Sequence, residues 1–132
     1  WKPLLEQARA AGARAREEVE AALADELSYL PRKEHRRRQT EYEERARRAE
    51  RRAKTGTLDH ALQLVGLWFR DLACIAAGAP ELVHHSDRLD ALQQDGRDGL
   101  AGVELVDDTR ARLALNVSEE LALEALAYRL ES

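Results

Sequence analysis

Apolar side chains recur three or four residues apart along most of this chain, which is the spacing of one face of an α-helix. Residues 4–29 show this pattern first, and Pro31 restricts the residue before it and predicts the end of the helix there. The most apolar segment is 58–77, whose broad face predicts a helix at the centre of the core. That face consists of Leu58, Ala61, Leu62, Val65, Trp68, Phe69, Leu72, Ile75 and Ala76.

Two further helices are predicted near the C-terminus. The first covers 98–115, with an inward face of Leu100, Val103, Val106, Leu113 and Ala114. Asn116-Val117-Ser118 predicts a tight corner, and Ser118 is a good N-cap for the last helix. The inward face of that helix is Leu123, Leu126, Ala127 and Leu130.

Segment 32–54 is nearly all charge and predicts a helix of another kind. Each of its glutamates precedes a basic residue by four positions, the order that stabilises a helix: Glu34–Arg38, Glu41–Arg45, Glu43–Arg47, Glu44–Arg48 and Glu50–Lys54. Its apolar stripe is thin, so we expect it to pack lightly if at all. Thr55-Gly56-Thr57 predicts a stop and a new N-cap after it.

Together these segments predict an all-α helical bundle of about five main helices. Residues 81–97 read as a connection that holds one short helix from about Ser86. We expect one helical domain over 1–132, with a charged helical lead-in at 1–54 and core helices at 57–131. Since the chain has no methionine, we expect it to be a piece of a longer protein.

Charge is unevenly distributed. Segment 32–54 holds eleven Lys and Arg against five Glu, a local net charge of +6, while the remainder carries −10. Such asymmetry can mark a nucleic-acid or partner contact. The single cysteine suits the cytosol, and no apolar run is long enough for a membrane span.

The sequence contains no complete motif for catalysis or metal binding. No glycine-rich phosphate loop occurs, and one cysteine with four scattered histidines does not make a zinc site. The single Glu81-x-x-His84 motif is half of what a di-iron bundle needs. We expect Cys74 to be a small apolar residue of the core and Asp71 to be a surface or interface charge. We therefore expect no enzyme activity, no cofactor, no metal and no small-molecule substrate.

The charged segment leaves two interpretations open. A nucleic-acid-binding helix would use Arg36, Arg37, Arg38, Arg48 and Arg52, and the alternative is a solvated or partner-facing helix. Because glutamates interleave with the arginines, no unbroken basic face is evident, and the second interpretation is favoured.

The C-terminal pattern resembles a known family. GLWFRDLACIAAGAPELVHHSD, a spacer with a helix, and then ARLALNVSEELALEALAYRL resemble the C-terminal helical domain of the bacterial DNA polymerase III delta-prime subunit. The resemblance covers roughly 57–131. It rests on Trp68, Arg70, Asp71, Asp87, Asn116, Leu121, Leu123, Glu124 and Leu126.

This resemblance implies a non-catalytic assembly domain. Delta-prime is a subunit of the clamp loader, and the C-terminal domains of the five subunits form a collar that supports loading of the sliding clamp onto primed DNA. The implied partners are the gamma/tau and delta subunits, with DNA met only through the complex, in the bacterial cytoplasm at the replisome. Trp68, Arg70, Asp71, Asn116, Leu121, Glu124 and Leu126 would be interface or structural anchors. The collar domain of delta or gamma/tau is the close alternative.

Overall fold

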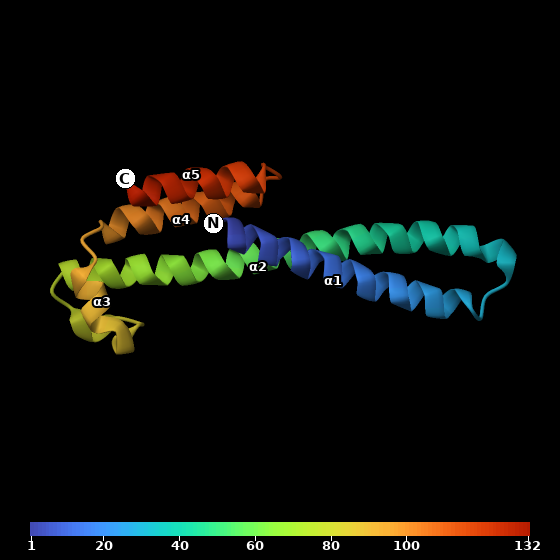
Figure 1. Ribbon diagram of the computed structural model, residues 1–132, viewed down its shortest axis with the longest axis horizontal. Helices are drawn as coiled ribbons and strands as arrows, with labels where there is room; N and C mark the ends of the chain where they lie inside the picture. Colours follow the sequence, from blue (N-terminus) through green and yellow to red (C-terminus); the bar gives the residue numbers. More distant parts are fainter. The chain divides into compact units, whose positions relative to one another are not determined.

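The computed structural model describes all residues 1–132, and every regular element in it is helical. The five α-helices are α1 (Lys2–Leu27), α2 (His35–Ala76), α3 (Leu89–Gln94), α4 (Gly99–Leu113) and α5 (Glu119–Glu131), shown in Figure 1. Short 3₁₀ turns lie at Arg32–Glu34, Pro80–Leu82 and Ser86–Arg88. The predicted all-α class is confirmed. No helix is both long and apolar enough to cross a membrane.

The chain divides into two compact units, Lys2–Leu58 and Trp1 with Asp59–Ser132. We call them the hairpin unit and the C-terminal unit, and each is described by itself. The division falls within α2. It lies a few residues after the boundary that the sequence predicted, between a lead-in that ends at residue 54 and core helices that begin at residue 57.

In the hairpin unit, α1 and the first part of α2 run antiparallel (Figure 1). A Cβ atom on Gly12 of α1 would lie 3.1 Å from both Cγ and the carbonyl oxygen of Glu50 on α2. Gly12 therefore permits close approach of the helices, and Ala46 of α2 is buried. The thin apolar stripe of this segment is the side that faces α1, and small side chains there let the two backbones come close.

The predicted break at 55–57 is also wrong, because α2 continues through it. The Thr57 hydroxyl donates a hydrogen bond to the Ala53 carbonyl at 2.9 Å, a bond of the helix interior and not of an N-cap. A glycine within a helix costs only about 1 kcal/mol relative to alanine. The long helix tolerates Gly56 at that cost.

In the C-terminal unit, α4 packs closely along the last part of α2. Gly99 and Gly102 of α4 are buried, and a Cβ atom on Gly102 would lie 2.1 Å from Cδ1 of Phe69. Farther along the same pair of helices, the Arg110 guanidinium binds Asp59 at 2.7 Å. These contacts run in opposite chain directions, so the two helices are antiparallel.

The inward face of α4 differs from the prediction. Its buried residues are Gly99, Gly102, Val106 and Thr109, whereas Leu100 is 70% exposed and Ala114 is exposed. Gly99 and Gly102 line the contact of α4 with α2, because the Phe69 ring fills the space beside Gly102. The side of α4 that comes closest to α2 is therefore not its most apolar side.

The core of this unit forms around Phe69, Leu72 and Leu92, three buried residues from α2 and α3. Val65, Trp68, Ile75, Val83, Val103 and Leu130 pack against it. On α5, Leu123 and Leu126 are buried, as predicted. The segment 58–77 and the last helix thus bury the leucines that the apolar pattern predicted, and the short helix of the connection begins at Leu89, after a 3₁₀ turn at Ser86–Arg88.

Candidate functional site

The last helix carries apolar residues on both of its faces. Leu123 and Leu126 are buried, while Leu121 and Tyr128 are 66% and 76% exposed. Ala125 between them is also exposed. At 100° per residue, Leu121, Ala125 and Tyr128 lie on the side of α5 opposite the buried leucines. We call these three residues the α5 stripe.

Charged residues border the α5 stripe. Glu120, Glu124 and Glu131 follow one side of it on the helical wheel, and Arg129 lies on the other side; all four are exposed. The corner before α5 adds Leu115, 76% exposed, and Val117, 42% exposed. An apolar centre with a charged border is the composition of a protein–protein interface.

The position of α5 is fixed by its first turn and its corner. Asn116 has a φ of 61°, a left-handed conformation that asparagine tolerates better than most residues. The Ser118 hydroxyl accepts a hydrogen bond from the Leu121 amide at 3.4 Å, as an N-cap does. The predicted corner is therefore present, and α5 packs side by side with α4 (Figure 1).

Asp71 occupies a different place from the predicted one. It is fully buried, so the interpretation as a surface or interface charge is wrong. Its carboxylate accepts hydrogen bonds from the backbone amides of His84 and His85 at 2.7 and 2.9 Å. It also lies 2.7 Å from Nδ1 of His85. Asp71 thus attaches the segment after α2 to the helix itself.

The protonation of Asp71 follows from these contacts. Burial by itself would raise the pKa of this carboxyl, but the hydrogen bonds from His84 and His85 outweigh it, and the pKa is lowered. The carboxylate is therefore ionised at neutral pH. Its role here is structural, because all its hydrogen-bonding partners belong to the loop that it holds.

Trp68 makes a second polar attachment nearby. Its indole Nε1 donates a hydrogen bond to Asp95 at 2.9 Å, and Arg97 binds the same carboxylate at 2.6 Å. The Trp68 ring also contacts the His85 ring edge-on, with centroids 5.5 Å apart. Trp68 therefore joins α2 to the segments that precede and follow α3.

The other predicted anchors fall into two groups. Leu126 is buried, whereas Arg70, Asn116, Leu121 and Glu124 are exposed. The structure thus brings Trp68 and Asp71 together with the loop around His85, and it leaves Leu121 and Glu124 on the outer side of α5. Tyr128 was not predicted, although its spacing of seven residues from Leu121 indicates that both lie on the same side of a helix.

The predicted arginines of segment 32–54 also fall into two groups, one bound by carboxylates and one exposed. Arg38 is engaged by Glu26 and Glu41, whereas Arg36, Arg37, Arg48 and Arg52 are exposed. Of the predicted pairs along the helix, Glu43–Arg47 and Glu44–Arg48 are present at 3.5 and 4.0 Å. Glu41 instead pairs with Arg37 and Arg38, and Glu50 pairs with Arg16.

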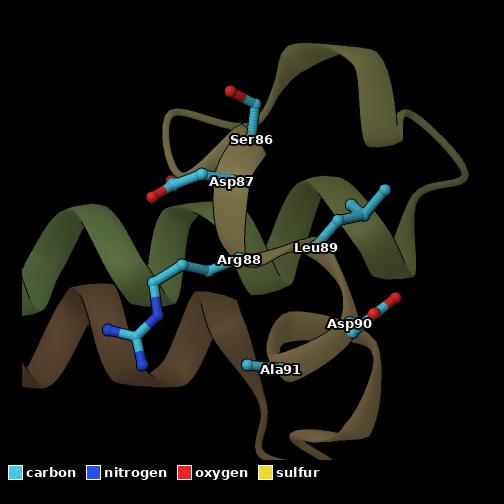
Figure 2. Close-up of a pocket in the computed structure, with 6 residues that line it drawn as sticks. All are labelled: Ser86, Asp87, Arg88, Leu89, Asp90 and Ala91. Carbon is cyan, nitrogen blue, oxygen red and sulfur yellow. The ribbon is translucent and has the colours of Figure 1, made fainter.

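One hollow in the surface lies at the segment that leads into α3. Ser86 to Ala91 line an open depression, shown in Figure 2. There the side chains of Asp87 and Arg88 point to one side, and those of Leu89 and Asp90 point to the other. No group of three or more His, Cys, Asp or Glu side chains is arranged to hold a metal ion, and Cys74 is half-buried.

Comparison with known proteins adds no relative: no family model, no curated protein and no solved structure matches this chain.

Proposed function

We propose that this chain is the C-terminal domain of a clamp-loader subunit, of the delta-prime kind, and that it works by assembly without chemistry of its own. The observation that carries this proposal is the α5 stripe, exposed apolar surface on the last helix where the sequence resemblance implies contact between subunits. An isolated exposed leucine would mean little. Here Leu121, Ala125 and Tyr128 share one face of one helix.

The mechanism that we propose is packing of the α5 stripe against the C-terminal domain of a neighbouring subunit. Full burial of a side chain the size of leucine stabilises an interface by about 1.5–3 kcal/mol. Tyrosine is also enriched at binding hot spots, since it offers a large rigid surface. The bordering Glu120, Glu124 and Arg129 would then select the orientation through complementary charges on the partner.

Two features support a rigid presentation of this face. Asp71 and Trp68 hold the connection after α2 through buried or half-buried hydrogen bonds. The Ser118 cap and the Asn116 corner define where α5 starts. A preorganised surface loses less conformational entropy on binding than a flexible one.

The proposed partners are the gamma/tau and delta subunits, and the proposed site of action is the bacterial cytoplasm, where the complex meets DNA. In this scheme the domain itself carries no catalytic residue.

The test is complex formation with the C-terminal domain of the cognate gamma/tau subunit, measured by gel filtration with light scattering. We expect a stable heteromeric complex with the unmodified chain. Replacing the stripe residues, as Leu121→Glu with Tyr128→Glu, should abolish it.

The chain offers a matched control for this experiment. Leu82 and Tyr29 are 59% and 83% exposed and lie outside α4 and α5. Leu82→Glu with Tyr29→Glu makes the same chemical change and should leave the complex intact. If neither gamma/tau nor a mixture of gamma/tau and delta binds the unmodified chain, the proposal is wrong.

A further inference from the structure

Packing of α1 against α2 separates charges that alternate in the sequence. Arg16 of α1 reaches across to Glu43 and Glu50 of α2, at 2.6 and 2.9 Å. Farther along the hairpin unit, Arg38 binds Glu26 of α1 and Glu41 of its own helix. Glu41, Glu43 and Glu50 are half-buried, and each of them binds one of these two arginines.

The exposed side of α2 is left with arginine. Between residues 36 and 52, the one exposed acidic residue is Glu44, whose carboxylate lies 4.0 Å from Arg48. Arg37, Arg47 and Arg48 have side chains that are 84%, 69% and 66% exposed. We call the exposed arginines of this stretch the arginine face: Arg36, Arg37, Arg45, Arg47, Arg48, Arg51 and Arg52.

Several of these guanidinium groups form no ion pair, so their N–H donors can bind a ligand. Arg36, Arg45, Arg51 and Arg52 form no ion pair, and the Arg45 guanidinium lies over the ring of Tyr42, 5.0 Å from its centroid. An arginine offers five N–H donors in a geometry that matches phosphate oxygens. The interleaved sequence does not reveal this surface, because Glu43 and Glu50 are held by Arg16 of α1, a contact between distant segments.

The composition of the arginine face selects one class of ligand. It contains no exposed leucine, valine or aromatic residue, so it lacks the apolar centre that a protein partner needs. Interfaces with nucleic acid are, in contrast, polar and strongly positive. We propose that the arginine face binds the phosphate backbone of a nucleic-acid duplex without reading its sequence. This proposal is independent of the assembly role above.

A duplex suits this face better than a single strand. Binding of single strands relies on aromatic side chains on which bases stack. The nearest aromatic residue, Tyr42, is half-buried and donates its hydroxyl hydrogen bond to Glu26. The face spans sixteen residue steps, roughly 24 Å of helix at 1.5 Å per residue, which matches about seven base-pair steps of a duplex.

The test measures binding of the full chain to a fluorescent DNA duplex of mixed sequence by anisotropy, at several salt concentrations. If four phosphates are contacted, the logarithm of the binding constant falls with the logarithm of salt with a slope of about −3.6. The variant Arg37→Gln, Arg48→Gln, Arg51→Gln removes three arginines from one side of the helix. We expect it to reduce that slope by about 2.7 and to weaken binding at least tenfold at low salt.

A charge-matched control lies elsewhere on the chain. Arg9, Arg14 and Arg129 are exposed and form no ion pair. The variant Arg9→Gln, Arg14→Gln, Arg129→Gln lowers the net charge equally and should change binding less than twofold. Circular dichroism should show equal helix content for both variants, because glutamine is a good helix former.

Three results would overturn the proposal. They are absence of duplex binding at low salt, an equal loss in both triple variants, and tighter binding of a polyglutamate peptide than of DNA. A single strand of the same length that binds more tightly than the duplex would overturn the choice of duplex.

Discussion

Replacing Asp71 by asparagine tests the internal attachment that holds the C-terminal unit together. The side chain keeps its shape but loses its charge and one of its two acceptor oxygens. In the native structure the two oxygens accept from the His84 amide at 2.7 Å, the His85 amide at 2.9 Å and the His85 ring at 2.7 Å. With asparagine, at least one of these part-buried donors faces an NH₂ group.

The magnitude follows from these contacts. A hydrogen bond to a charged group contributes about 1.5–3 kcal/mol, and a buried donor without a partner costs about 1–3 kcal/mol. Removing a buried charge offsets part of this loss. We therefore expect Asp71→Asn to lower the free energy of unfolding by about 2–3 kcal/mol.

The assay is urea unfolding followed by far-UV circular dichroism. Asp87→Asn in the same loop is the control, since Asp87 is exposed, and it should change stability by less than about 0.5 kcal/mol. Amide hydrogen exchange should also quicken at His84 and His85 in Asp71→Asn. Equal stability of Asp71→Asn and the unmodified chain, within about 0.5 kcal/mol, would refute the reasoning.

Four further predictions concern the packing and the charges. Hydrogen bonds from Arg97, with that from Trp68, hold the pKa of Asp95 far below its usual value of about 3.9. Since the folded state has the lower pKa, ionised Asp95 contributes its full stability above about pH 4, and this stability is lost as the pH falls further. The urea midpoint of Asp95→Asn should therefore fall less between neutral and acid pH than that of the unmodified chain. Gly102→Ala should destabilise the fold by about 2 kcal/mol or more, because its Cβ would meet the Phe69 ring. Gly56→Ala, with no atom within 4 Å, should stabilise it by about 0.5–1 kcal/mol, and thermal unfolding of the pair measures both. Leu121→Glu with Tyr128→Glu should change the urea midpoint of the isolated chain little, because both side chains are exposed.

Helical periodicity predicted much of the fold. The buried positions Leu62, Phe69, Leu72, Leu123 and Leu126 all lie on the expected faces. Burial of one apolar side follows directly from a spacing of 3.6 residues per turn.

The remaining features depend on contacts between segments that periodicity does not report. Asp71 is buried because its donors lie thirteen and fourteen residues farther along the chain. Gly102 lies inward because Phe69 fills the space that its missing side chain leaves. The arginine face arises because Arg16 draws Glu43 and Glu50 toward α1. Each case joins residues far apart in the sequence.

Photocrosslinking tests most directly the proposed assembly role, in which the outer side of α5 would contact the C-terminal domain of a clamp-loader subunit. A benzophenone amino acid at position 128 replaces the exposed Tyr128, and the same group at position 29 replaces the equally exposed Tyr29 as a control. We predict that position 128 crosslinks to the C-terminal domain of purified gamma/tau or delta and that position 29 does not. No crosslink from position 128, or equal crosslinking from both positions, would contradict the account.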